Sequence, residues 1–348
     1  MRFELAFVSC ALAAAACDAA APAPTLPAAP ALSAALPAIE SPAAGRDDLL
    51  SALPPAPSVD PQRSALGMKL FDTASLSTDG SVSCSTCHPL ARAGADGLVH
   101  SRGANGHETT LNTPTIYNVS FNFRFNWNGA YTRLEDALDA PIALTLGTTW
   151  SAIEEQLRAQ PEWRMAFDAA YRDGVTTANI KDALARYIDT LTTPDARFDQ
   201  FWRGDTDALT NEERRGYETF EALGCSTCHQ GANVGGNMFQ RLGVMHDYFQ
   251  ARVEHGGPAP SAADLGRYQT TQQHADRHVF RVPSLRNVAL TPPYFHDGSE
   301  PTLELAVAEM GYVQLGKRLS DEEVSLLVAF LKTLTGPAAQ SPRRGTGS

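Results

Sequence analysis

The sequence predicts a mainly α-helical protein built from two tandem domains of the same kind. Capped, amphipathic helical segments recur along the chain, strand-like alternation is scarce, and one five-residue unit occurs twice, at Cys84–His88 and Cys225–His229. At 348 residues the chain is long enough for two domains, and 43% hydrophobic with 19% charged residues is ordinary for a folded protein.

The N-terminus predicts export. Arg2 precedes an apolar run from Leu5 to Ala16 that is too short to span a bilayer, and residues 1–16 end before Cys17 as in a bacterial lipoprotein signal. Cleavage after a later Ala-x-Ala sequence would instead release an unanchored product, and a single-pass anchor is a third alternative. Residues 17–58, rich in Ala and Pro, are expected to form a tether. We therefore expect a periplasmic protein, attached to a membrane through Cys17 in the lipoprotein alternative.

A helix is expected before each repeated unit. Asp60 and Pro61 suit the cap and first position of a helix that runs through Leu70 towards the first unit. In the second half, Thr210–Glu213 forms a capping box, and the helix that it opens stops at Gly224, directly before Cys225.

A glycine-rich stretch follows each unit, and one more helix is expected near the end of the chain. Glycine-rich stretches, Gly94–Gly106 and Gly231–Gly236, follow the two units and would let the backbone pass close to a flat ligand. A helix is expected from Ser320, with Glu323 in the capping-box position and Gly336-Pro337 at its end.

The repeated unit has the form Cys-x-x-Cys-His, which is typical of covalent haem c attachment. Of six cysteines, Cys10 and Cys17 lie in the signal region, and the others belong to the two units. Two sulfurs spaced three residues apart reach the two vinyl groups of one porphyrin, and the next imidazole reaches the iron. The predicted haem-binding residues are Cys84, Cys87, His88, Cys225, Cys228 and His229.

Three other uses of these cysteines fit the pattern less well. Disulfides within the units would be strained and would not explain the histidines. A structural zinc site usually has its Cys pairs closer together in sequence. A thioredoxin-like motif needs a βαβ context that is missing here. Two covalent haem groups therefore explain the pattern best.

The formal net charge of −11 argues against nucleic acid as a partner, because no clustered basic face is visible in the sequence. It would suit a partner with a basic docking face.

Several blocks resemble the bacterial di-haem cytochrome c peroxidases, in that family's order from about residue 60 to about residue 336. They are Leu66–Phe71, Asn112–Thr115, Arg197–Asp199, Val282–Asn287, Pro293–Gly298 and Ala329–Lys332. The resemblance implies two cytochrome c-like haem domains packed face to face. The expected limits are 59–198 for a peroxidatic N-terminal domain, 199–336 for an electron-accepting C-terminal domain, and 337–348 for a tail.

The resemblance also implies roles for single residues. Met310 falls where the family supplies a Met ligand to the C-terminal haem iron, a pairing with His that raises the reduction potential. Trp127 matches the tryptophan between the haems; its other interpretation is a buried interface aromatic. Asn112, Thr291 and Pro293 match the ligands of a calcium ion, whose preference is for oxygen.

The distal pocket of the N-terminal haem departs from the family. Alignment puts Ala104 at the family's loop His, Ala137 at its Gln and Gly147 at its Glu. Loss of such acid–base groups slows O–O cleavage by roughly 10²–10⁴-fold. His107, three residues further on, is a candidate replacement as ligand or base, and a solvated loop His is the alternative.

Three functions follow from the resemblance. The first is reduction of hydrogen peroxide with electrons from a small cytochrome c or a cupredoxin. The second is a non-enzymatic di-haem electron carrier. The third is a di-haem enzyme that oxidises Trp residues of a partner protein, although in the best-known case a Tyr replaces the Met ligand. A homodimer is compatible with all three.

Overall fold

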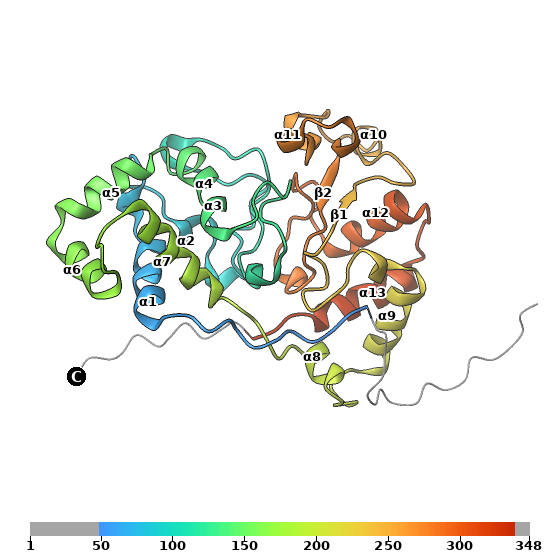
Figure 1. Ribbon diagram of the computed structural model, residues 1–348. Coiled ribbons are helices and arrows are strands. Elements are labelled where there is room, and N and C mark those ends of the chain that lie inside the picture. Colours follow the sequence, from blue (N-terminus) through green and yellow to red (C-terminus); the bar gives the residue numbers. More distant parts are fainter. Residues whose placement is uncertain (1–48, 338–348) are drawn as a thin grey trace, which may run out of the picture. The chain divides into compact units, whose positions relative to one another are not determined.

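The computed structural model describes residues 49–337, so the export signal, Cys17, most of the predicted tether and the tail from residue 338 lie outside the described residues. As predicted, the described part is mainly helical (Figure 1). Its helices and strands are α1 (Pro61–Phe71), α2 (Cys84–Cys87), α3 (Leu134–Ala137), α4 (Asp139–Leu144), α5 (Trp150–Ala159), α6 (Pro161–Ala170), α7 (Thr177–Asp189), α8 (Arg197–Trp202), α9 (Asn211–Ala222), β1 (Phe239–Arg241), α10 (Tyr248–Glu254), α11 (Tyr268–Thr271), β2 (Val279–Arg281), α12 (Leu303–Leu315) and α13 (Asp321–Thr333). Strands β1 and β2 pair antiparallel, with Phe239 opposite Arg281.

The three helices expected from capping signals are present. The Asp60 carboxylate accepts hydrogen bonds from the backbone N–H groups of Gln62 (2.8 Å) and Arg63 (3.1 Å) at the start of α1. Reciprocal capping boxes open α9 at Thr210 and α13 at Ser320. Each cap satisfies backbone donors that the first helical turn leaves without a partner.

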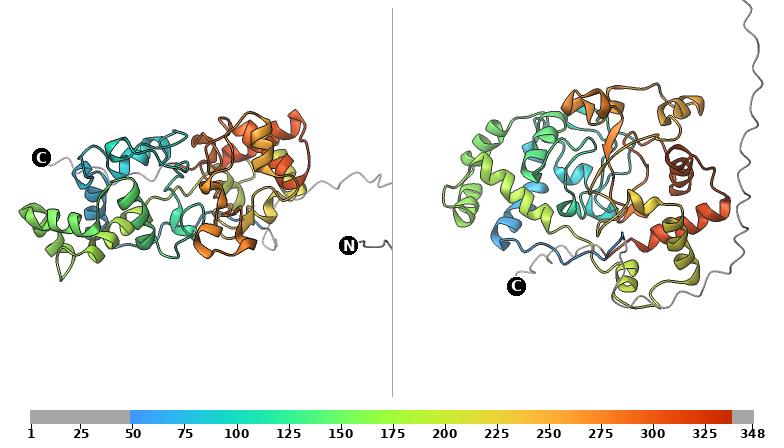
Figure 2. Two further views of the ribbon diagram at one scale, coloured as in Figure 1. Left: turned by 90° about the horizontal axis from the view of Figure 1, so that it is seen from above. Right: turned by 45° about the vertical axis from the view of Figure 1, so that its right-hand side comes forward.

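Each half has its own hydrophobic core, organised by a helix pair that crosses at a glycine. Helix α1 packs on α7 in one core, and α9 packs on α13 in the other (Figures 1 and 2). A Cβ added to Gly67 would lie 1.9 Å from the Ala183 carbonyl oxygen, and one added to Gly216 would lie 2.1 Å from that of Leu326. The repeat therefore extends from the Cys-x-x-Cys-His units to the helix packing. The limits 59–198 and 199–336 themselves stay a prediction.

The last part of the predicted tether belongs to the folded unit. Leu50 and Leu53 are buried, and Leu50 lies in the C-terminal core. The Leu53 N–H donates to Asp199 Oδ1 (3.0 Å), and the Gly231 N–H donates to the Leu49 carbonyl (2.6 Å). A loose tether is therefore wrong for residues 49–53, which we call the strap, because its leucines add to a core and its backbone finds partners.

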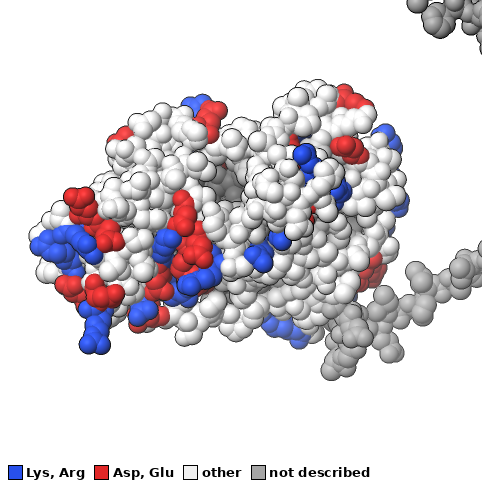
Figure 3. All heavy atoms as spheres, turned by 45° about the horizontal axis from the view of Figure 1, so that its top comes forward, with Lys and Arg blue, Asp and Glu red and all other residues white. Residues whose placement is uncertain are grey.

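No helix in residues 49–337 has both the length and the apolarity needed to cross a bilayer. On the face shown in Figure 3, acidic and basic side chains are mixed at the end of the molecule that carries α5–α7. Ion pairs in this part include Arg186 with Glu135 and with Asp189, both at 2.8 Å.

Candidate functional site

The first Cys-x-x-Cys-His unit forms helix α2, which presents an oriented imidazole. Nδ1 of His88 lies 2.9 Å from the Gly94 carbonyl oxygen. Because a carbonyl can only accept, Nδ1 carries the hydrogen, and Nε2 keeps its lone pair for a metal. Burial lowers the pKa of His88, partly offset by the Gly94 and Pro114 carbonyls, so the ring is neutral.

The second unit also holds a buried histidine, but Nδ1 of His229 has no hydrogen-bond partner among the described residues. A 3₁₀ turn spans Cys225–Thr227 after Gly224, whose φ of 80° is the left-handed conformation that ends the preceding helix. Burial lowers the pKa of His229 to about 4, and the Val234 and Pro283 carbonyls oppose that shift. Both units therefore present a buried, neutral histidine, but only the His88 ring is oriented by a hydrogen bond to the following loop.

The four cysteines of the units are free thiols. Burial raises the pKa of Cys84 to about 12 and that of Cys225 to about 11, so these thiols stay protonated at neutral pH. Among the described residues, the Asp, Glu, His and Cys side chains that lie close enough together to hold a metal ion do not include these cysteines. Two thiols and one neutral imidazole per unit fit covalent haem c better than a disulfide or a zinc site.

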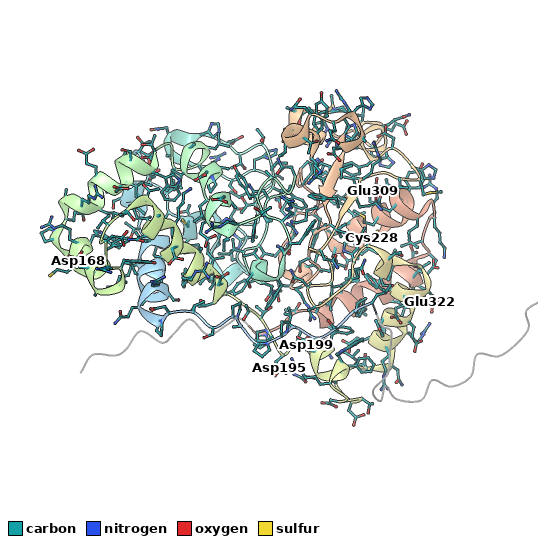
Figure 4. All side chains as sticks on the ribbon, viewed as in Figure 1. Asp168, Asp195, Asp199, Cys228, Glu309 and Glu322 are labelled. Atoms are coloured by element: carbon teal, nitrogen blue, oxygen red, sulfur yellow. The ribbon has the colours of Figure 1, made fainter. Side chains whose placement is uncertain are left out.

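An apolar cavity opens beside the second unit and collects several predicted site residues. Cys225, Cys228 and His229 line one part of it, and Met310 from α12 and Trp127 line others. Figure 4 labels Cys228 and also Glu309, the residue before Met310 on α12. The apolar wall is completed by side chains that include Leu303, Ala306, Val307, Leu327 and Leu331. A space lined by hydrocarbon, two thiols, an imidazole and a thioether matches a porphyrin with a His and a Met ligand.

Trp127 is held in the cavity wall by contacts from both halves of the chain. Its Nε1–H donates to the Asn112 carbonyl (2.9 Å), while the Asn112 N–H donates to the His296 carbonyl (2.8 Å). The Trp127 and His296 rings meet edge to face with centroids 6.5 Å apart. The indole is therefore fixed rather than free to rotate.

The three residues matched to a calcium ion also line this cavity. The Asn112 side-chain amide donates through Nδ2 to the Leu98 carbonyl (2.8 Å), which fixes the direction of its oxygen. Within the described part of the chain, no hydrogen bond given to the Thr291 or Pro293 carbonyl oxygen is found. Oxygen acceptors without a donor are the kind of ligand that Ca²⁺ prefers.

Sequence reasoning missed a buried network behind Trp127. His296 Nε2 lies 2.7 Å from Asp264 Oδ1, and Arg252 makes ion pairs with Asp264 (2.9 Å) and with Asp297. Burial alone would raise the pKa of Asp264, but hydrogen bonds from His296 and Arg252 outweigh it and hold that pKa well below its usual range. Asp264, His296 and Asp297 are close enough to hold a metal, but Arg252 already supplies their positive charge. Only the His296 block was visible as a sequence motif.

The three distal positions offer no acid–base group. Ala104 and Ala137 are buried, and a Cβ added to Gly147 would lie 3.7 Å from that of Ala104. The alignment thus brought together two positions that are neighbours in space. The His107 side chain is exposed, and its loop is held by the Gly103 N–H donating to the His107 carbonyl (2.7 Å).

Comparison with known proteins identifies the family to which the chain is similar. Residues 61–207 match the family described as di-haem cytochrome c peroxidase. Cytochrome c551 peroxidase of Nitrosomonas europaea is 40% identical over 274 residues, which cover 78% of this chain and 79% of that protein. Cytochrome c peroxidase Ccp of Escherichia coli is 38% identical over 294 residues, covering 84% of this chain but only 62% of that longer protein. Among solved structures, a MauG-like protein associated with microbial copper homeostasis superposes with a TM-score of 0.72 at 28% identity, covering 86% of this chain and 98% of that one.

Proposed function

Because the chain belongs to the di-haem cytochrome c peroxidase family, we propose that it is an exported enzyme that reduces hydrogen peroxide with electrons from a small cytochrome c or cupredoxin. The reaction takes two electrons and two protons per peroxide and yields two waters. When bound, the two haem c groups of this family supply one-electron transfer and cleavage of the O–O bond. The convergence of His229, Met310 and Trp127 on one cavity is the observation that carries the proposal.

We propose that the C-terminal half is the electron entry. The iron of the haem attached to Cys225 and Cys228 would be ligated by His229, which burial keeps neutral, and by the Met310 thioether. This pair of ligands favours the reduced state of the iron. Trp127 would then provide a fixed aromatic step towards the N-terminal half, because its indole is anchored on Asn112.

In the N-terminal half, His88 is the proposed proximal ligand. The distal side of this haem lacks an acid–base group at the positions where the family has one. Alanine and glycine at positions 104, 137 and 147 cannot move a proton, so peroxide cleavage is expected to be slower by roughly 10²–10⁴-fold than with an acid–base group. We propose His107 as the residue that makes up part of this loss, which requires its exposed side chain to turn towards the distal face.

We also propose a calcium ion held by the Asn112 side-chain oxygen and the Thr291 and Pro293 carbonyls. Support comes from their common place in the cavity wall and from the carbonyl oxygens left without donors. Such an ion would tie Asn112, and through it Trp127, to the segment before His296.

Periplasmic location, lipid attachment at Cys17 and homodimer formation are further proposals. They rest on the signal-like N-terminus, on the position of Cys17 and on the family.

A second candidate function is oxidation of Trp residues in a partner protein. It rests on the resemblance to the protein-modifying members of the family and on the similarity to the MauG-like structure. Met310 argues for the first candidate, because a Met ligand matches the peroxidases.

Stopped-flow mixing of the half-reduced protein with hydrogen peroxide tests the proposal. A peroxidase should change its haem spectrum rapidly and then oxidise a reduced small cytochrome catalytically. A protein that exchanges electrons with the cytochrome but does not respond to peroxide would be a carrier. A fast peroxide reaction without cytochrome turnover would favour the partner-modifying candidate.

A further inference from the structure

Three arginines are buried in the described part of the chain, and two of them have acidic partners there. Arg286 is ion-paired with Asp199 at 2.8 Å, and Arg252 is ion-paired with Asp264 and Asp297. The third, Arg281, is only 6% exposed, and no carboxylate among the described residues lies within ion-pair distance of it.

The contacts of Arg281 do not neutralise its charge. Its Nε donates to the Asn126 carbonyl (3.3 Å), and its Nη1 donates to the Val282 carbonyl (3.4 Å). Both distances are at the long end of a hydrogen bond. Burial lowers the pKa of Arg281 to about 10, so the guanidinium is still charged at neutral pH. A buried charge without a counter-ion is strongly unfavourable, so the described residues lack a partner that Arg281 needs.

The place of Arg281 indicates where that partner comes from. Arg281 ends strand β2 and lines the same cavity as His229 and Met310. Its backbone N–H donates to the Trp127 carbonyl (2.9 Å), so the backbone of Arg281 is fixed beside that of Trp127. A haem in this cavity brings two carboxylates of its own, the propionates.

We propose that the Arg281 guanidinium binds a propionate of the haem attached to Cys225 and Cys228. The planar guanidinium matches a carboxylate in a two-pronged contact and prefers such a partner in a desolvated setting. The contact places that propionate next to Trp127 and keeps a positive charge near the C-terminal iron. The inference requires haem in the cavity, not peroxidase activity, so it can fail or hold independently of the proposed function.

The test is a spectroelectrochemical titration of the C-terminal haem in the full-length two-haem protein. Arg281→Gln should lower its reduction potential, because a positive charge near the iron favours the less positive reduced state. Arg281→Lys should retain most of the wild-type potential. Arg318→Gln, which removes an exposed arginine from the same half, is the matched control and should leave the potential unchanged. The near-infrared sulfur-to-iron band confirms that Met310 stays bound in each variant.

An unchanged potential in Arg281→Gln with that band intact would overturn the proposal. If Arg281→Gln does not fold, the resonance Raman propionate-bending mode of Arg281→Lys decides the matter. A shift of this mode from wild type supports the contact, and an identical mode refutes it. Titration with acetate tests whether Arg281 binds a free carboxylate from solution. A wild-type potential that depends on acetate concentration would show that Arg281 binds free anions instead of the propionate.

Discussion

Replacing Asp199 is expected to destabilise the protein strongly, although in the sequence it is only the last residue of the Arg197–Asp199 block. Asp199 lies in the first turn of α8, where Figure 4 labels it. Its side chain is fully buried. It accepts hydrogen bonds from the backbone N–H groups of Leu53 and Ala196, both at 3.0 Å, and pairs with Arg286 at 2.8 Å.

The expected cost follows from those contacts. Asp199→Ala leaves a buried guanidinium without a counter-ion, which costs about 3–5 kcal/mol in comparable buried pairs. A domain of ordinary stability has about 5–15 kcal/mol in total, so the variant should be close to unfolding. Asp199→Asn keeps an acceptor for the strap but loses the charge. Its stability should therefore lie between that of Asp199→Ala and that of the wild type.

Asp195 provides a matched control within four residues. Its carboxylate also pairs with an arginine, Arg203, at 3.0 Å, but its side chain is 62% exposed. Such a surface pair contributes about 0–1 kcal/mol. Because the φ of Asp195 is 70°, a conformation that Asn tolerates as well as Asp, the control variant is Asp195→Asn, which should leave the unfolding midpoint almost unchanged.

Urea unfolding should be followed both by far-ultraviolet circular dichroism and by the spectrum of the C-terminal haem. The second signal matters because Arg286 Nε donates to the Ala232 carbonyl (2.9 Å), in the loop after His229, and its Nη2 donates to the Ser51 carbonyl (3.0 Å). We expect the haem signal to change at or before the main transition in Asp199→Ala. A loss of less than about 1 kcal/mol for Asp199→Ala, no larger than that of Asp195→Asn, would refute the reasoning.

Met310→Ala should abolish the near-infrared sulfur-to-iron band and lower the potential of the C-terminal haem; an unchanged spectrum would reduce Met310 to a packing residue. His107→Ala should slow peroxide-driven oxidation of a reduced cytochrome by roughly 10²-fold or more, and an unchanged rate would show a solvated loop histidine. Because the pKa of Asp264 is depressed in the folded protein, its contribution to stability is complete above the ordinary aspartate pKa and is lost as pH falls through the folded pKa. The stability gap between wild type and Asp264→Asn should therefore shrink on acidification, and a constant gap would contradict this. Removing calcium with a chelator should shift the unfolding midpoint downwards and Ca²⁺ should restore it, whereas no shift would exclude the site at Asn112.

Local signals explain what could be predicted without a structure. The Cys-x-x-Cys-His units, the caps at Asp60, Thr210 and Ser320 and the helical periodicity all act within a few residues, so a linear sequence shows them directly. The gathering of Met310, Trp127 and Asn112 at one cavity was expected only through the family resemblance, because nothing local links positions so far apart.

Tertiary structure alone decided the remaining points. In the sequence, the strap is part of an Ala- and Pro-rich segment that predicts a tether. Only the fold brings the Leu53 backbone N–H into a hydrogen bond with Asp199, 146 residues away along the chain. His107 is a plausible base in the sequence, but whether a loop side chain faces solvent depends on the fold of that loop. Arg281 is one arginine among many in the sequence. Burial and the positions of the carboxylates around it are set by long-range packing, and only that packing reveals a buried charge without an acidic partner among the described residues.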